Sequence, residues 1–335
     1  MKPEDYNPSN YLPQGYYPWP DKINPNVEQM GIDYRNWIDT DYVYLSENIR
    51  ERYKGMNLHK CSARMYPYAN YERVTPMHRY VVFHTIFDDQ LEYSTEEEVS
   101  RYCDRLVAIF RGDSLTPEDP GYFIQAAKIR DEFGAFMPDE WMKRLADTFY
   151  TVTRYGAQEE ATYKATQTVP SLALFKVLRE YSIVIFPYFY LVDAEFHTFL
   201  TEEVERHPVI QRVKSVWSRI IAWQNDIQGL KKELSKDTEV MNIVIVLQRN
   251  YNLSLEDALS EAMKIHDDDL AELVALQEDL PDFGKYQEEV KQLFFGWGSL
   301  IQGLNTFYLV DTNRYDPKCF AWPDILPLKR KSRIN

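Results

Sequence analysis

The sequence has few glycines and few cysteines for its length. Twelve glycines among 335 residues are too few for glycine-rich phosphate loops or for a fold built on many tight β-turns. Three cysteines, Cys61, Cys103 and Cys319, do not make a disulfide framework, and their scarcity is typical of a reducing cytoplasm. We therefore expect a cytoplasmic protein. The hydrophobic fraction of 44% is enough to form a sizeable core.

Long hydrophobic runs and positive charge are also scarce. No stretch approaches the roughly 18 consecutive apolar residues of a membrane-spanning helix, and residues 1–6 show no apolar signal segment. The formal net charge of −14 disfavours nucleic acid and anionic membranes as partners. An anionic small molecule can still bind where metal ions and a few basic side chains gather.

The sequence is rich in helical periodicity with clear helix starts. Ser94 and Thr95 precede three glutamates, which is typical of a capped helix N-terminus, and Pro187 predicts a kink in the helix that contains it. The expected helices cover residues 75–93, 96–111, 139–156, 171–200, 207–235, 254–280 and 286–310. No useful β alternation appears, so we expect one all-α domain of about ten helices after an extended strap over residues 1–25.

An acidic motif, Asp88-Asp89-Gln90-Leu91-Glu92, follows an apolar helical run. Asp88 and Glu92 are four residues apart and share one helix face, while Asp89 points about a quarter turn away. Carboxylates are the hard oxygen ligands that Mg²⁺ prefers. Taken alone, the motif is better explained by a solvated helix end.

A second polar motif runs from Asn225 to Glu233 within another expected helix. Asn225, Gly229 and Glu233 lie four residues apart on one face, over a rise of about 12 Å. An amide oxygen and a carboxylate on successive turns can hold a cation with water between them, and Lys232 can reach a phosphate oxygen. Taken alone, this motif too is compatible with a polar helix face.

Together these motifs resemble the class I terpene synthases of the bacterial type, and the resemblance covers nearly the whole chain. The aspartate-rich and Asn-Asp…Glu motifs stand in the family's order, and Arg179 lies 46 residues before Asn225, where the family keeps its diphosphate-sensing arginine. Further landmarks are the proline and aromatic opening at 17–26, Trp37, the segment of Arg64, Tyr66, Pro67 and Ala69, and the C-terminal pair Arg314-Tyr315.

The resemblance implies a single-domain helical bundle around a central active-site cavity. It implies a cyclase domain over residues 26–315 and a C-terminal tail over 316–335 that belongs to the active-site lid. It also implies three Mg²⁺ ions with substrate bound, held by Asp88, Asp89, Glu92, Asn225, Gly229 and Glu233. The implied diphosphate-binding residues are Arg179, Asn225, Lys232, Arg314 and Tyr315, and all of these except Asn225 are the implied catalytic residues.

Two positions depart from the family pattern. Gly229 stands where the family usually has Ser or Thr, which removes one hydroxyl ligand that a water can replace. Ile183 stands where bacterial relatives often have Gly at a helix break; the family uses a backbone carbonyl there, and Ser182 would link it to Arg179.

Aromatic residues make up 15% of the chain, and a carbocation enzyme needs a pocket walled with rings. Tyr308, six residues before Arg314, is the strongest candidate, because many relatives carry Trp there. His84 lies one turn before Asp88 and could orient water, accept a proton or simply bond to backbone. The full set of expected cavity residues is Phe83, His84, Phe87, Tyr181, Ser182, Ile183, Trp297, Phe307 and Tyr308; for the other rings, core packing is the alternative.

The implied reaction ionises a linear isoprenoid diphosphate and cyclises the carbocation to a hydrocarbon or alcohol, releasing diphosphate. Farnesyl diphosphate is slightly favoured over geranylgeranyl diphosphate, and the enzyme is expected as a monomer or homodimer. A chain-elongating prenyltransferase would need a second aspartate-rich motif, and a proton-initiated cyclase an Asp-x-Asp-Asp signature. A catalytically impaired helical paralogue that only binds remains an alternative because of Gly229. His266 to Asp269 is expected to be a solvated helix face.

Overall fold

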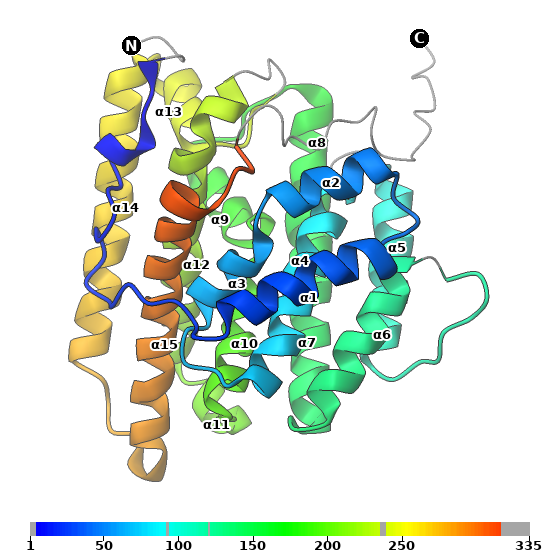
Figure 1. Ribbon diagram of the computed structural model, residues 1–335. Coiled ribbons are helices and arrows are strands. Elements are labelled where there is room, and N and C mark those ends of the chain that lie inside the picture. The colour runs from blue at the N-terminus through cyan, green and yellow to red at the C-terminus, as the bar shows by residue number, and fades with distance from the viewer. Residues whose placement is uncertain (1–4, 92–93, 120, 235–238, 316–335) are drawn as a thin grey trace.

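The computed structural model describes residues 5–91, 94–119, 121–234 and 239–315, and every regular element in them is a helix (Figure 1). The α-helices are α1 (Val27–Thr40), α2 (Glu47–Gly55), α3 (Leu58–Met65), α4 (Tyr71–Leu91), α5 (Glu96–Phe110), α6 (Gly121–Gly134), α7 (Asp139–Val152), α8 (Gln158–Thr166), α9 (Leu172–Ser182), α10 (Phe186–Phe196), α11 (Glu202–Glu205), α12 (Pro208–Leu234), α13 (Ile243–Tyr251), α14 (Leu255–Glu278) and α15 (Gln287–Thr306). Two π-helical segments, η3 (Thr153–Ala157) and η5 (Phe307–Asp311), continue α7 and α15, and two short 3₁₀ helices are η2 (Pro8–Asn10) and η4 (Gly284–Tyr286). The expected all-α fold is confirmed.

Indole groups join the central helices α10, α12 and α15. Trp217 on α12 donates its Nε1–H to the carbonyl oxygen of Trp297 on α15 at 2.9 Å, and Trp297 donates to the carbonyl of Phe189 on α10 at 3.2 Å. The rings of Trp297 and Phe189 also stack at 3.8 Å. Each buried N–H therefore has a partner, and the large rings fix how the three helices pack.

The helix predicted over residues 171–200 is wrong as a single kinked helix. The chain leaves helical geometry after Ser182, Val184 takes a left-handed φ of 54°, and α10 begins at Phe186. Pro187 lies in the first turn of α10, where its missing N–H costs no hydrogen bond. The proline therefore starts a new helix instead of bending an old one.

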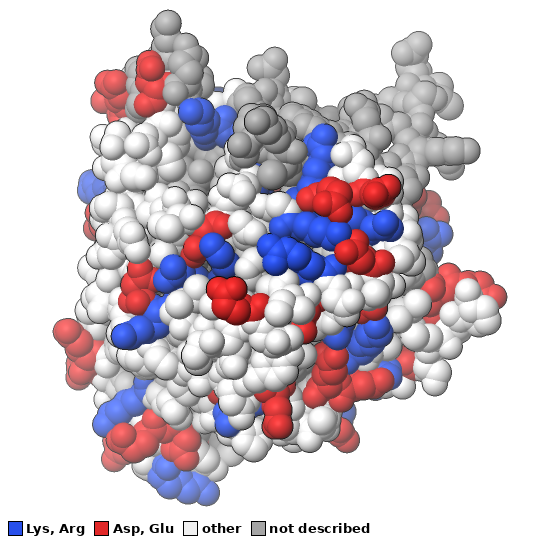
Figure 2. All heavy atoms as spheres, viewed as in Figure 1, with Lys and Arg blue, Asp and Glu red and all other residues white. Residues whose placement is uncertain are grey.

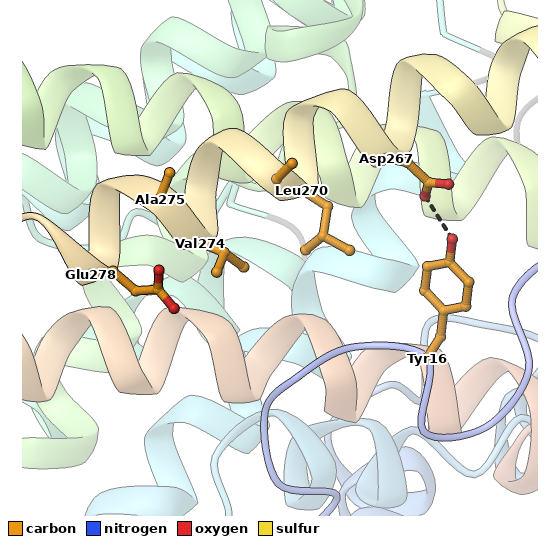
Figure 3. Close-up of a pocket in the computed structure, with 7 residues that line it drawn as sticks. Tyr16, Asp267, Leu270, Val274, Ala275 and Glu278 are labelled. Carbon is orange, nitrogen blue, oxygen red and sulfur yellow. Dashed lines mark hydrogen bonds between the residues drawn. The ribbon is translucent and has the colours of Figure 1, made fainter.

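The N-terminal segment before α1 contains the short helix η2 and runs along α14 and α15 (Figure 1). The Tyr16 hydroxyl donates to Asp267 Oδ1 at 2.6 Å, as Figure 3 shows, and Trp19 Nε1 donates to Gln277 Oε1 at 3.0 Å. Tyr16 and one face of α14 line a surface groove of about 460 Å³. The aromatic side chains of Tyr16 and Trp19 thus fix the segment to α14.

The expectation of a solvated face at residues 266–269 is wrong for two of the four residues. His266 is fully buried, and its Nε2 lies 2.9 Å from the hydroxyl of Tyr17. Asp269 is 6% exposed and accepts hydrogen bonds from Arg219 Nε at 3.1 Å and from Trp223 Nε1 at 2.8 Å. Two residues of this polar run therefore stabilise the packing of α14, because α12 and the N-terminal segment supply their hydrogen-bond partners.

On the face shown in Figure 2, acidic and basic side chains are interspersed and do not separate into one large patch of either sign. Ion pairs between acidic and basic side chains include Lys54 with Asp39 at 2.6 Å and Arg64 with Asp21 at 3.1 Å. Within the described ranges, no helix has both the length and the apolar character needed to cross a membrane.

Candidate active site

The two sequence motifs and the C-terminal Arg-Tyr pair meet at one end of the bundle. The final turns of α4 and α12 and the segment after α15 all lie at the upper end in Figure 1. Asn225 Nδ2 donates to the Tyr308 hydroxyl at 2.9 Å, and Arg314 pairs with Asp89. Residues separated by more than two hundred positions are therefore joined directly in one site.

The acidic motif lies in the last turn of α4. Asp89 is 6% exposed and accepts two parallel hydrogen bonds from Arg314, at 3.0 and 2.6 Å, and a third from the Tyr53 hydroxyl at 3.0 Å. Burial alone would raise the pKa of Asp89, but the charge and hydrogen bonds of Arg314 lower it overall. Asp88 is half-buried, and Glu92 lies outside the described residues.

The position of Arg314 is set by the corner between α2 and α3. Asn57 Nδ2 donates to the Asp311 carbonyl at 3.0 Å, and the Thr312 hydroxyl donates to the Met56 carbonyl at 2.8 Å. Arg64 Nε donates to Asp311 Oδ2 at 2.8 Å. These contacts fix the chain just before Arg314, so its guanidinium is held over α4 before any ligand binds.

The second motif places Asn225, Gly229 and Glu233 on successive turns of α12. A Cβ added at Gly229 would lie 3.1 Å from Glu233 Oε1 and 3.7 Å from the Tyr315 ring. Glu233 Oε2 accepts a hydrogen bond from Asn242, the residue that caps α13. The glycine therefore leaves room for a carboxylate and a tyrosine ring to lie close against the helix.

Arg179 projects from α9 toward the second motif and is 7% exposed. Its guanidinium donates to Asn225 Oδ1 at 3.1 Å and to Asp226 Oδ1 at 3.0 Å, and it approaches Glu160 Oε2 at 3.4 Å. A planar fork with several donors suits such multiple contacts. Arg179 thus lies beside Asn225.

Sequence reasoning missed three residues that hold the site together. Asp226 is fully buried and accepts from Arg179 and from the backbone N–H of Ile243 at 2.8 Å. Asn242 donates to the Asp226 carbonyl at 2.8 Å, and Tyr53 donates to Asp89. A signal was present for two of them: Asp226 follows Asn225 directly, and Asn242 precedes an apolar run in the manner of a helix N-cap.

Negative charge is in surplus around the end of α12. Burial, followed by the charges of Glu239 and Asp226, raises the pKa of Glu233 to about 8. Burial also raises the pKa of Asp226 to about 6, although Arg179 opposes this. A bound cation would relieve this crowding and keep Glu233 ionised, so the donor set here fits a divalent metal ion.

Among the described residues, no group of three or more His, Cys, Asp or Glu converges to hold a metal by itself. Mg²⁺ usually binds through one or two carboxylates together with waters and phosphate oxygens. Lys232 is close enough to lower the pKa of Asp89, so a basic residue of the second motif lies within electrostatic range of the first. The residues present therefore fit metal ions that are shared with a phosphate-bearing ligand.

Three of the rings expected in the cavity pack in the core. Phe83 and Phe87 stack on each other at 5.8 Å and lie against Phe149, and both are at most 1% exposed. Trp297 stacks on Phe189 at 3.8 Å. These three rings are thus buried against other aromatic side chains.

The helix break after α9 brings Tyr181, Ser182 and Ile183 against η3. A Cβ at Gly156 would lie 2.5 Å from the Tyr181 carbonyl carbon, so the absence of a side chain allows this close approach. The backbone N–H of Ile183 donates to the Arg179 carbonyl at 3.1 Å. The end of α9 that carries Arg179 therefore packs directly against η3.

Two candidate wall residues remain next to the motifs. Tyr308 is half-buried, and its ring lies 5.6 Å from that of Tyr315 and 5.9 Å from that of the buried Phe307. His84 is buried, and its Nδ1 lies 2.8 Å from the Tyr188 hydroxyl. Burial lowers the pKa of His84 to about 4, so its imidazole is neutral near pH 7.

Comparison with known proteins agrees with this architecture. A family model described as "Terpene synthase family 2, C-terminal metal binding" matches residues 79–272. Germacrene A synthase of Nostoc punctiforme is 25% identical over 90% of this chain and 94% of that protein. The 4-epi-cubebol synthase of Streptosporangium roseum is 26% identical over 82% of this chain and 83% of that protein.

Solved structures share the fold. A variant of the SVS_A2 protein from ancestral sequence reconstruction superposes with a TM-score of 0.80 at 21% identity, over 90% of both chains. Linalool/nerolidol synthase from Streptomyces clavuligerus gives a TM-score of 0.75 at 15% identity, over 87% of this chain and 98% of that one. Fold and metal-binding match together define a class I terpene synthase. The chain belongs to terpene synthase family 2, and it is a terpene cyclase.

Proposed function

We propose that this enzyme converts farnesyl diphosphate into a cyclic sesquiterpene and diphosphate, with Mg²⁺ as its metal. The observation that carries the proposal is the direct pairing of acids with arginines at one end of the bundle, Asp89 with Arg314 and Asp226 with Arg179. Acids suited to a metal and cations suited to a diphosphate thus lie together. A site of this kind binds a metal diphosphate in a protein of net charge −14.

The two motifs would hold the metal from opposite sides. Asp88, Asp89 and Glu92 would contribute oxygens from α4 and the residues after it, and Asn225 and Glu233 from α12. Mg²⁺ supplies Lewis acidity that stabilises negative charge on the departing diphosphate. Gly229 has no side-chain ligand, so a water would take the place that a hydroxyl has in other family members.

The basic residues would bind and orient the diphosphate. Arg179 and Arg314 present forked donors that match phosphate oxygens, and Lys232 and Tyr315 add a point charge and a hydroxyl donor. Arg314 is now held by Asp89, and Arg179 by Asp226. A diphosphate would compete with these carboxylates, so its arrival would couple substrate binding to a rearrangement at the mouth of the site.

The hydrocarbon part of the substrate requires a dry surface with aromatic faces. Tyr308 is oriented by its hydrogen bond with Asn225, so one residue of the diphosphate end also positions a ring for the carbocation. An aromatic face stabilises a cation by about 0.5–2 kcal/mol when desolvated. Exclusion of water protects the intermediates until the reaction ends.

The chain length of the substrate is supported by the named relatives. The 4-epi-cubebol synthase is described as cyclizing (2E,6E)-farnesyl diphosphate, and the same is stated of a (+)-T-muurolol synthase from Roseiflexus castenholzii that is 22% identical. These similarities favour a C15 substrate over geranylgeranyl diphosphate.

The test is incubation of the protein with geranyl, farnesyl or geranylgeranyl diphosphate, with Mg²⁺ or with a chelator. We expect cyclic C15 products and diphosphate from farnesyl diphosphate, and none with the chelator. Binding without turnover would instead indicate an impaired paralogue. Longer prenyl diphosphates, formed when isopentenyl diphosphate is added, would indicate a chain-elongating transferase.

A further inference from the structure

A buried polar cluster lies one helical turn below the acidic motif. We define the His84 cluster as His84 and Tyr80 on α4, Tyr188 on α10, and Tyr66 just after α3. The Tyr80 ring stacks on His84 at 5.5 Å and meets the Tyr188 ring edge-on at 5.4 Å. His84 Nδ1 lies 2.8 Å from the Tyr188 hydroxyl, which fixes the orientation of the imidazole.

Two hydroxyls of the cluster have no hydrogen-bond partner in the described part of the chain. They belong to Tyr66 and Tyr80, both fully buried. Glu195 Oε2 is likewise buried without a partner, and Glu195 lies close enough to influence the ionisation of Tyr66. Buried polar atoms in native proteins almost always have a partner, in the protein or in water. Several such atoms together therefore point to a held water molecule.

The cluster shares a helix face with the acidic motif, because Tyr80, His84 and Asp88 are four residues apart on α4. The buried thiol of Cys61 lies within electrostatic range of Arg314 at the mouth and of Tyr66 and Tyr188 in the cluster. Tyr188 is also within electrostatic range of Asp88. The cluster therefore lies on the face of α4 that carries Asp88, one helical turn from the predicted metal site.

We propose that the His84 cluster holds the water that ends the reaction, so that the enzyme forms a sesquiterpene alcohol and His84 accepts the proton. This inference rests on the proposed function, because it needs a carbocation in the same site. Tyr66 and Tyr80 hold the water, and Tyr188 is a positioning residue for the imidazole. The side chains of this cluster thereby determine whether the product is an alcohol or a hydrocarbon.

The step balances without any further reactant. A lone pair of the water oxygen forms the new C–O bond to the last carbocation, and no other heavy-atom bond breaks. The proton lost from that water passes to Nε2 of His84, while Nδ1–H donates to the Tyr188 oxygen. Because burial lowers its pKa to about 4, the imidazole is unprotonated and free to accept a proton. The oxonium formed when water adds to a carbocation is a far stronger acid than an imidazolium, so the proton, and with it the positive charge, moves to His84.

The experiment compares product mixtures from farnesyl diphosphate in water enriched in ¹⁸O. The wild-type enzyme should give a labelled alcohol. His84→Phe should lower the ratio of alcohol to hydrocarbon on the order of 100-fold, while total diphosphate release changes far less. Tyr188→Phe removes only one oxygen atom and should lower the same ratio about tenfold.

Tyr42→Phe is the matched control. Tyr42 is also fully buried with a hydroxyl that lacks a partner in the described residues, but it lies between α1 and α2, with Tyr44 as its nearest ring at 5.9 Å. Its product ratio should equal that of the wild type. Circular dichroism establishes that each variant is folded, and Tyr188→Phe decides the matter if His84→Phe does not fold.

The outcomes separate this inference from the proposed function. A wild-type enzyme that makes only hydrocarbons from farnesyl diphosphate overturns the inference and leaves the cyclase intact. An alcohol ratio unchanged in both His84→Phe and Tyr188→Phe also overturns it. If none of the three substrates gives a cyclic product, the proposed function is itself wrong and the inference fails with it.

Discussion

The α4 side and the α12 side of the candidate active site differ in how their carboxylates are paired with positive charge. On the α4 side, Asp89 meets one arginine in a bidentate pair, and its pKa is lowered in spite of burial. On the α12 side, Asp226, Glu160 and Glu233 share Arg179, and the pKa of Glu233 is raised to about 8. The Asp89–Arg314 pair is neutral without a metal, whereas the second side has a surplus of carboxyl groups that a proton or a bound cation can balance.

This difference teaches which contacts stabilise the fold and which serve the reaction. Arg179 and Asp226 are both buried, so their pair is part of the core. The Arg314 side chain retains 18% exposure at the mouth, so solvent can replace part of its contact with Asp89. We therefore expect loss of Arg179 to affect stability most, and loss of Arg314 to affect turnover most.

The largest effect on folding should come from Arg179→Met. Asp226 would be left buried without its cationic partner, and the free energy of unfolding should fall by about 3 kcal/mol or more. Denaturant unfolding measures this. Arg212→Met is the matched control, because Arg212 pairs with Glu272 at the surface and should cost less than about 1 kcal/mol. Equal losses in the two variants would remove the distinction between a core pair and a surface pair.

Arg314→Met should act mainly on catalysis. We expect kcat/KM for farnesyl diphosphate to fall on the order of 100-fold, since a donor to the departing diphosphate is lost, with little change in the melting temperature. Arg314→Lys keeps the charge without the fork and should recover only part of the activity. A melting temperature that falls as far as in Arg179→Met would show that both sides of the mouth are structural.

The α12 side should also make the stability of the metal-free enzyme depend on pH. The Glu233 carboxyl ionises near 4.5 when unfolded and near 8 when folded. Between these values the folded state binds more protons, so stability falls as pH rises toward 8. Burial holds the pKa of His59, His78 and His84 at about 3 to 4, so these histidines do not titrate above pH 6.5.

Thermal melts between pH 6.5 and 8.5 with a chelator would measure this slope, and Glu233→Gln should reduce it. Glu195 is a second contributor, since burial raises its pKa to about 8, so Glu195→Gln should reduce the slope independently. Added Mg²⁺ should raise the melting temperature at pH 8 in the wild type and not in Glu233→Gln. A slope that neither substitution changes would contradict the charge surplus described for α12.

The smallest effect should come from Gly229→Ser. Its Cβ would lie 3.1 Å from Glu233 Oε1, so the carboxylate must shift by a few tenths of an ångström. The hydroxyl should lower the Mg²⁺ concentration needed for half-maximal turnover, while the parent enzyme remains active with water in that place. Turnover is measured against Mg²⁺ for both. A parent that never turns over, beside an active Gly229→Ser, would exclude the water ligand.

The sequence was sufficient for the long helices and for the spacing within each motif. Thr95 caps its helix as predicted, in a capping box with Glu98, and the motif residues of α12 share one face as their spacing required. The short helices were missed because their patterns are weak: α3 has eight residues, and its buried positions include polar His59 and Ser62. Burial on nearly all sides leaves no periodic contrast to detect.

Pairing across the bundle could not be predicted from spacing. Asp89 and Arg314 are separated by 225 positions, and only the tertiary fold brings them together. Asp226 follows Asn225 directly, but its side chain points to Arg179 and to the start of α13. Spacing within a helix shows which residues share a face, whereas their partners depend on which helix packs against that face.

The N-terminal segment has a consequence for how the chain is made. Tyr6 donates to the Ile227 carbonyl at 2.7 Å, Gln224 donates to the Tyr17 hydroxyl at 3.0 Å, and Asn305 donates to the Pro13 carbonyl at 3.0 Å. The residues that contact α12 and α15 from this segment are therefore synthesised more than two hundred residues before their partners. Contacts so distant in sequence form late. This segment therefore has no partners through most of translation, and its docking onto α12 and α15 is a late step of folding.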